Sequence, residues 1–205
     1  MDINLVRLVG FVALGSVGGC SSVTEPASDP KPEVPKFSCI ANSATMRLPA
    51  DLQANLPTFG PRVPDDAYVA ISQSVPGGFA GVFFEDNHFV LTFVDPAKAN
   101  EARSQIQQAF ASRGVGGTNL DVAKAEFRGA RWTFAELDEW YRYIIPKLAG
   151  PGSGISFTDI DEKANTIAFG VIDETARAQL EARLAALGVS CNLATTVIQG
   201  YAIAL

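Results

Sequence analysis

The sequence predicts an α+β protein built from two tandem repeats, each with the element order α-β-β-α-β and each forming a three-stranded sheet with two helices. Residues 65–127 and 133–199 show the same succession of helix-like and strand-like segments. The hairpin segments also share a pattern, GVFFED with NHFVLTFVD in the first repeat and GISFTD with NTIAFGVID in the second. After the first hairpin, Asp95 can cap the next helix.

The first repeat is expected to open with a short helix capped by Asp65. Its apolar face would consist of Tyr68, Ile71 and Val75. Asp95 followed by Pro96 is a typical helix start, because proline at the first helical position needs no N–H partner. The elements expected after the first helix are strands over 81–86 and 89–94, a helix from Pro96 to near Gly114 that aligns Ala99, Ala102, Ile106, Ala109 and Phe110, and a strand over 122–127.

The second repeat is expected to open at Thr133, where Glu136 completes a capping box. The elements expected after this cap are a helix carrying Phe134, Leu137, Tyr141, Ile144, Ile145 and Leu148, strands over 154–159 and 165–173, a helix with Ala176, Leu180, Leu184 and Leu187, and a strand over 192–199. The second hairpin is expected to be five residues longer, at 160–164. We expect the two halves to pack together or to share one sheet, because a lone three-stranded sheet leaves one face open.

The N-terminal segment predicts an export signal over residues 1–19. Residues 8–19 are apolar or small, a stretch too short to span a bilayer. The stretch ends in Val17-Gly-Gly-Cys20, which resembles a bacterial lipobox. The resemblance implies cleavage before Cys20, acyl chains such as palmitate on this cysteine, and a lipid-anchored protein of the cell envelope facing the periplasm or the cell exterior. An ordinary cleaved signal and an inert first helix are the alternatives.

The three cysteines fit this interpretation. If Cys20 carries lipid, Cys39 and Cys191 remain as a pair that an oxidising compartment would allow to form a disulfide. Two separate buried thiols are the alternative. The expected organisation is a signal peptide at 1–19, a lipidated cysteine with a proline-rich tether at 20–38, a first repeat at 39–130 and a second repeat at 131–205.

The segments WTFAELDEWYRYI and DIDEKANTIAFGVIDETARAQLEARLAALGV of the second repeat resemble the pro-regions of secreted bacterial serine proteases of the α-lytic protease and streptogrisin type. The resemblance covers about 60 residues and rests on fold elements rather than on catalytic residues. Pro-regions of this family dock a sheet edge and a C-terminal tail on their protease. No protease domain follows before Leu205, so the resemblance implies a fold and a mode of contact.

Catalytic and metal-binding patterns are not found in the sequence, and we expect a non-enzyme without metal or cofactor. His88 is expected in a hairpin turn, away from any nucleophile and carboxylate that would complete a triad. The carboxylates of Asp159, Asp161 and Glu162 lack the further oxygen ligands of a calcium loop, so a solvated turn is the preferred interpretation. The net charge of −6 argues against nucleic acid and against a polybasic membrane surface.

Two apolar features are candidates for binding a partner. Trp140 and Tyr143 are expected at the edge of a helix, half-exposed, and the stretch from Tyr201 to Leu205 is apolar. The leading hypothesis is therefore an envelope module that binds a protein, such as a secreted or envelope protease, by strand addition at an open sheet edge. A sensor that binds a small ligand or an ion between the repeats and a purely structural lipoprotein are the alternatives.

Overall fold

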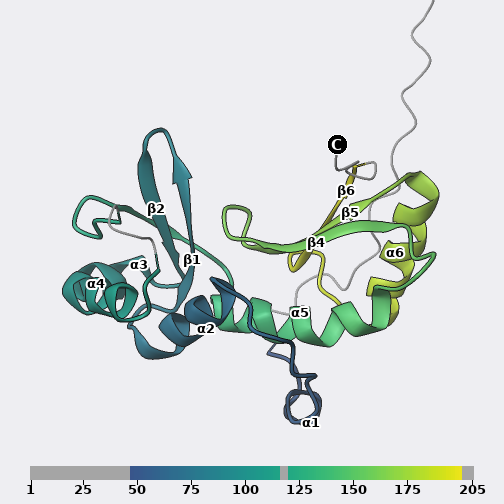
Figure 1. The fold of residues 1–205 in the computed structure, drawn as a ribbon, viewed down its shortest axis with the longest axis horizontal. Helices are drawn as coiled ribbons and strands as arrows, with labels where there is room; N and C mark the ends of the chain where they lie inside the picture. Colours follow the sequence, from purple (N-terminus) through teal and green to yellow (C-terminus); the bar gives the residue numbers. More distant parts are fainter. Residues whose placement is uncertain (1–46, 116–119, 200–205) are drawn as a thin grey trace, which may run out of the picture. The chain divides into compact units, whose positions relative to one another are not determined.

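The computed structural model describes residues 47–115 and 120–199, which form the predicted α+β fold of two repeats (Figure 1). The first repeat contains α2 (Asp65–Ser74), β1 (Phe79–Glu85), β2 (His88–Phe93), α3 (Pro96–Glu101), α4 (Arg103–Ser112) and β3 (Glu126–Gly129). The second contains α5 (Phe134–Leu148), β4 (Ile155–Asp161), β5 (Thr166–Val171), α6 (Glu174–Ala186) and β6 (Ala194–Ile198). A short helix, α1 (Ala50–Gln53), precedes them.

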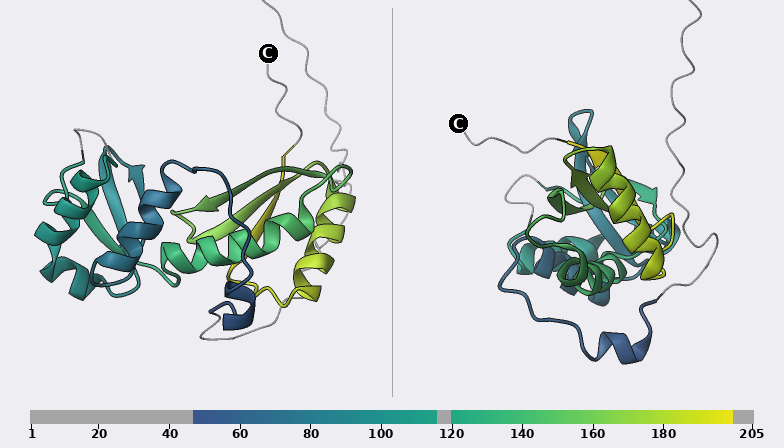
Figure 2. Two further views of the ribbon diagram at one scale, coloured as in Figure 1. Left: turned by 60° about the horizontal axis from the view of Figure 1, so that its bottom comes forward. Right: turned by 90° about the vertical axis from the view of Figure 1, so that its right-hand side faces the viewer.

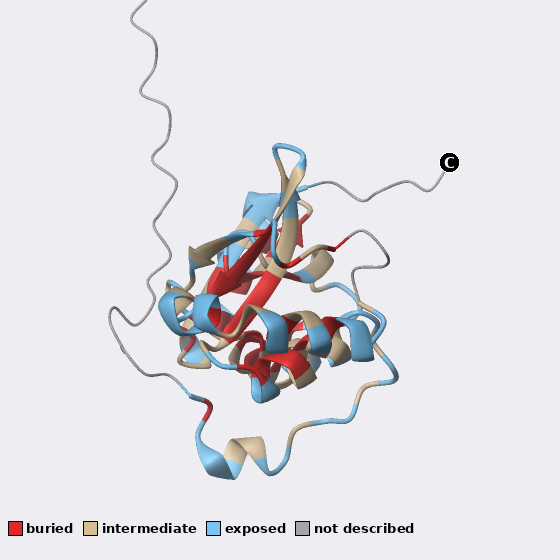
Figure 3. Ribbon diagram, turned by 90° about the vertical axis from the view of Figure 1, so that its left-hand side faces the viewer, coloured by how far each residue is buried: buried red, intermediate tan, exposed pale blue. Residues whose placement is uncertain are grey.

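The two sheets have the same topology. In each, the middle strand pairs antiparallel with the strand before it and parallel with the strand after it, which gives the orders β1-β2-β3 and β4-β5-β6 (Figure 2). The repeats pack together as two separate sheets rather than sharing one sheet. One apolar core runs through both repeats, and in it the rings of Tyr68 on α2 and Phe134 on α5 lie edge to face at 5.2 Å. Buried residues gather where strands meet helices (Figure 3).

The predicted helix caps are confirmed in two of three cases. The side chain of Asp95 accepts a hydrogen bond from the Lys98 N–H before α3, as predicted. A further cap that was not predicted is Asp173, whose side chain accepts a hydrogen bond from the Ala176 N–H before α6. Thr133 and Glu136 form the expected capping box before α5. The capping role predicted for Asp65 is wrong, because Asp65 is the first residue of α2 and Pro64 occupies the cap position without a side-chain hydrogen bond.

The end of the first repeat differs from the prediction in two places. The helix expected from Pro96 to Gly114 is interrupted at Ala102, whose N–H closes a tight turn on Ala99 O at 3.0 Å, so that α3 and α4 are separate. The strand expected over 122–127 begins only at Glu126. Residues 122–125 form a turn because the Asp121 side chain accepts a hydrogen bond from Ala123 N–H and Asp121 O accepts from the next two amides.

The register of the duplication also needs correction. The sequence pattern matches Gly81 with Gly154, but the strand pairing does not. Gly81 pairs with Thr92, the second-last residue of β2, whereas the second-last residue of β5, Gly170, pairs with Phe157. The counterpart of Gly154 (φ 70°) is Gly78 (φ 68°). The carbonyl oxygen of each accepts a hydrogen bond from the N–H of the first residue after the middle strand, which is Ile172 for Gly154 and Val94 for Gly78. The innermost pairs, Glu85 with His88 and Asp161 with Thr166, enclose two and four residues, so the second hairpin is longer by two residues rather than five.

The export signal, Cys20, the tether, Cys39, Tyr201 and Leu205 lie outside the described residues. Within the described ranges, every helix is too short or too polar to cross a membrane.

Candidate functional site

β6 forms one edge of the second sheet. Its bonding to β5 includes Ile167 N–H to Leu193 O and Gln199 N–H to Val171 O, both at 2.8 Å. Since alternate residues of a strand bond to the same neighbour, the N–H and C=O groups of Ala194, Thr196 and Ile198 point away from β5. No other strand of the described residues pairs on that side. Such a row of unpaired groups is a template for a strand of another chain.

The other three sheet edges of the described residues carry features that discourage strand addition. β3 has only four residues, and its Glu126 and Arg128 form an ion pair at 2.5 Å. β1 and β4 are each interrupted by a register shift near their start, and β4 also carries Asp159 and Asp161. β6 has the sequence ATTVI, without charge, proline or register shift. Because short length, charge and bulges protect natural edges, β6 is the unprotected edge.

Apolar side chains accompany this edge. Val197 and Ile198 are each 46% exposed, which is high for large hydrophobic residues at adjacent positions of one strand. Val197 pairs with Gly170 of β5, and the ring of Phe157 from β4 lies against Gly170. The absence of a side chain at Gly170 allows this approach, since a Cβ there would stand 2.1 Å from the ring. Phe157, Gly170 and Val197 are therefore neighbours across the three strands of this sheet, next to the edge.

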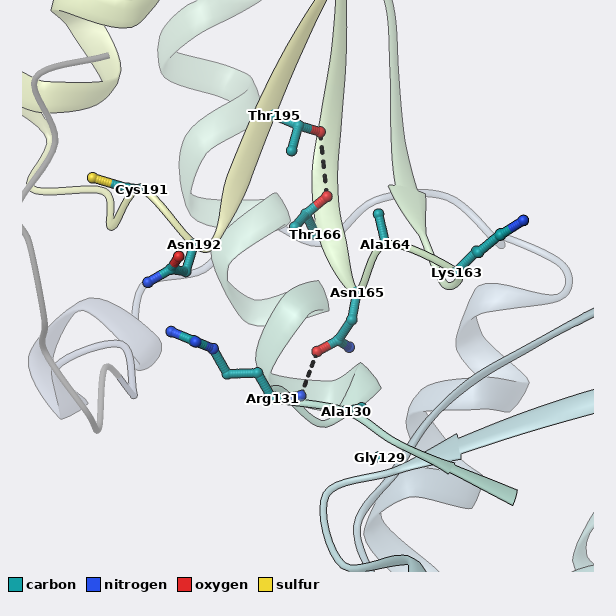
Figure 4. A pocket seen from close by; sticks show the side chains of 10 residues that line it. All are labelled: Gly129, Ala130, Arg131, Lys163, Ala164, Asn165, Thr166, Cys191, Asn192 and Thr195. Atoms are coloured by element: carbon teal, nitrogen blue, oxygen red, sulfur yellow. Dashed lines mark hydrogen bonds between the residues drawn. The ribbon is translucent and has the colours of Figure 1, made fainter. Parts of the chain in front are cut away.

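A pocket of about 680 Å³ lies at the start of β6 (Figure 4). Three segments line it: Gly129–Arg131, the β4–β5 turn with the first residue of β5 (163–166), and the residues Cys191, Asn192 and Thr195 around the beginning of β6. The buried side chain of Asn165 holds two of these segments together. Its Oδ1 accepts from the N–H groups of Arg131 and Trp132 at 2.8 Å, and its Nδ2 donates to Trp132 O at 2.9 Å.

Arg131 is exposed, and its side chain extends toward Asn192 (Figure 4). Every other Lys and Arg of the described residues has an ion pair or a side-chain hydrogen bond, whereas none is found for the Arg131 guanidinium in residues 47–115 and 120–199. Lys163 also lines the pocket, but its Nζ pairs with Glu85 at 2.5 Å. The pocket thus offers one positive charge that is not already neutralised.

The aromatic pair proposed for partner binding lies elsewhere. The expectation that Trp140 is half-exposed is wrong: it is 3% exposed and belongs to the core. Tyr143 is half-buried, with its ring 5.9 Å from that of Trp140 and 3.9 Å from Lys147 Nζ. Cys191 lies at the pocket, half-buried, while Cys39 is outside the described residues, so their pairing stays a prediction.

The single histidine is part of a surface network on the first sheet. His88 Nε2 lies 3.0 Å from Glu126 Oε2, and its Nδ1 lies 3.2 Å from Asp86 O. The hydrogen bond to Glu126 raises the pKa of His88, because the carboxylate favours the charged imidazolium. Arg128 links this network to Glu85 at 2.6 Å. The arrangement supports a surface ion-pair cluster.

The acidic turn of the second hairpin is only partly solvated. Burial raises the pKa of Glu162 to about 7, with repulsion from Asp159 and Asp65 adding to the effect of burial. Among the residues that the structure describes, no three His, Cys, Asp or Glu side chains are grouped so that they could hold a metal ion.

Comparison with known protein families and with curated protein sequences finds no match for this chain. The residues that sequence reasoning missed are Arg131, Asn165, Val197 and Ile198. The uncharged sequence of β6 was a usable signal for the last two. Arg131 and Asn165 are brought together only by the fold, since they are 34 positions apart.

Proposed function

We propose that this chain is a non-enzymatic, lipid-anchored module of the bacterial cell envelope that binds an extended segment of a protein partner by strand addition at β6. The observation that carries the proposal is the unprotected edge with its outward backbone groups and its exposed Val197 and Ile198. The resemblance of the second repeat to protease pro-regions, which dock a sheet edge on their partner, supports the same mode of contact.

The proposal can be tested by site-specific photocrosslinking in the bacterial envelope. A benzoylphenylalanine residue at position 197 of the full-length chain lies beside the proposed partner strand, whereas the same residue at position 179, an exposed position on α6, does not. We expect one protein to be crosslinked from position 197 and none from position 179. Equal crosslinking from both positions would contradict strand addition at β6.

A proline at the edge provides a matched variant. Because the Ile198 N–H points away from β5, Ile198→Pro removes a group that the partner needs without removing a β5–β6 hydrogen bond. We expect Ile198→Pro to abolish the crosslink from position 197 while the melting temperature changes little. A crosslink that persists in a folded Ile198→Pro protein would show that backbone pairing is not the mode of contact.

The proposed lipid anchor at Cys20 has a separate test. Mass spectrometry of the mature N-terminus should find an acylated Cys20 as the first residue. A chain that retains residues 1–19, or that is cleaved without acylation, would remove the anchor from the proposal and leave the binding module to be judged on its own.

A further inference from the structure

We infer that the pocket around Arg131 binds a carboxylate of the partner segment and so selects which strands can dock on β6. This inference rests on the proposed strand addition. It concerns a specificity site at one end of the edge, where Thr195 belongs both to the pocket and to β6, and Asn192 of the pocket lies two residues before the strand begins. A strand that pairs antiparallel with β6 brings its carboxyl end to this pocket.

The charge of the pocket favours an anion. The Arg131 guanidinium is the cation without a partner among the described residues, and a guanidinium can donate two parallel hydrogen bonds to one carboxylate. Further polar lining comes from the Asn192 side chain and from Thr166 and Thr195, whose Oγ1 atoms lie 3.2 Å apart. These groups supply further hydrogen-bonding atoms beside the guanidinium.

The number of uncommitted charges indicates a single carboxylate rather than a more highly charged group. Lys163 is already paired with Glu85, so one positive charge remains to be neutralised. A doubly charged phosphate would leave one negative charge uncompensated in a protein whose net charge is already −6.

The backbone of Arg131 is held in place by hydrogen bonds of its own segment, whereas its side chain has no such partner among the described residues. Its backbone N–H donates to the buried Asn165, which also binds both backbone groups of Trp132. Trp132 is itself anchored, because its Nε1 donates to Asn192 O at 3.2 Å. The backbone that carries the cation is therefore tied to the segment before β6, so that only the Arg131 side chain has to become ordered on binding.

The experiment uses the full-length protein in mild detergent and a fluorescein-labelled Val-Thr-Val-Thr-Val peptide in three forms. One has a free terminal carboxylate, one a terminal carboxamide, and one a carboxamide with Asp as its last residue. Fluorescence anisotropy gives the dissociation constants, and hydrogen exchange reports whether the amides of Thr196 and Ile198 become protected. We expect at least one carboxylate form to bind roughly tenfold more tightly than the plain carboxamide, as for a charge-assisted bidentate contact.

Two variants locate the effect. Arg131→Gln should reduce the affinity for the carboxylate peptides to that for the plain carboxamide, while Arg113→Gln, at an exposed position after α4, should leave all affinities unchanged. Tighter binding of one of the two carboxylate peptides shows whether the pocket prefers a C-terminal carboxylate or an Asp side chain. Equal binding of all three peptides with protected β6 amides overturns the carboxylate inference and leaves strand addition standing. No protection of these amides by any peptide overturns both.

Discussion

Glu162 lies directly against Gly81, so that a Cβ added to Gly81 would stand 2.5 Å from the Cβ and Cγ of Glu162. The contact joins the turn of the second hairpin to the face of the first sheet on which Thr92, the ladder partner of Gly81, is also buried. The neighbouring ion pair between Lys163 and Glu85 adds a second link between the same two elements. The two repeats are thus interlocked beyond the packing of α2 against α5.

A side chain at Gly81 should separate these elements. Gly81→Ala is expected to lower the free energy of unfolding by about 1–3 kcal/mol, because the new Cβ collides with Glu162 and the φ of 144° is unfavourable for alanine. Chemical denaturation measures the change. Gly129→Ala is the control, since nothing lies within 4 Å of its Cβ position and its φ is not in the positive range, and it should cost much less. Equal costs for the two variants would contradict the proposed contact.

The ionisation of Glu162 should make stability depend on pH. Its pKa is about 7 in the folded protein against an ordinary value of 4.5, so the folded state binds more protons than the unfolded state between these values. Stability should therefore fall as the pH rises from about 4.5 to about 7. Tyr68, Asp65, Asp159 and Asp161 are the titratable groups that face it.

Replacing this carboxyl group tests the pH dependence. Glu162→Gln should stabilise the protein at pH 8 by about 1–2 kcal/mol, less than the full value of the pKa shift because solvent screens a partly exposed group. At pH 4 the variant and the original protein should differ little. Glu101→Gln on the exposed surface of α3 serves as the control. Stabilisation of equal size at both pH values would rule out ionisation of Glu162 as its cause.

Asn165 should be important for stability although it lies in a turn. Asn165→Ala removes three hydrogen bonds and leaves the N–H groups of Arg131 and Trp132 without an acceptor, at a cost of about 2–4 kcal/mol. The φ of 54° adds strain for alanine. Thermal unfolding should show a large decrease in melting temperature, whereas Asn192→Ala, at an exposed position of the same pocket, should show a small one. A small effect at Asn165 would mean that the segment holds its position by other contacts.

Asp138 on α5 should be the most sensitive carboxylate. It is 4% exposed and accepts hydrogen bonds from Arg62 and from Arg142 Nε, the latter at 2.7 Å. Asp138→Ala should cost about 3–5 kcal/mol, because it leaves two partly buried guanidinium groups without this partner. Asp66→Ala, which removes the more exposed carboxylate bound to the same arginines, should cost less than about 1 kcal/mol. Denaturation curves at pH 7 compare the two.

Local patterns predicted most of the fold. The predicted caps at Asp95 and Thr133 were confirmed, because a cap depends only on a side chain and on backbone groups a few residues away. The alternation of apolar and polar residues identified the paired strands of each hairpin, because these strands are also close together in the sequence. The register between the repeats was mispredicted, because Gly81 was matched by identity to Gly154 although its role is to make room for Glu162, a residue distant in sequence.

The candidate site was less accessible to sequence reasoning. Trp140 was expected to be half-exposed because of its place at the edge of the helix, but it is buried, since partners outside its own helix determine its burial. The pocket at Arg131 depends on the approach of three segments, one of which is held by Asn165 through backbone groups that no sequence pattern marks. The unprotected edge at β6 could have been predicted, because the absence of charged residues and proline from this strand is visible in the sequence.

The contact between Gly81 and Glu162 has a consequence for the order in which parts of the chain fold. Glu162 and Lys163 lie far behind Gly81 and Glu85 in the sequence, so these contacts can form only when the second hairpin has folded. Until then, one side of the first sheet lacks a neighbour that it has in the finished protein. The first repeat therefore gains its full set of contacts only together with the second.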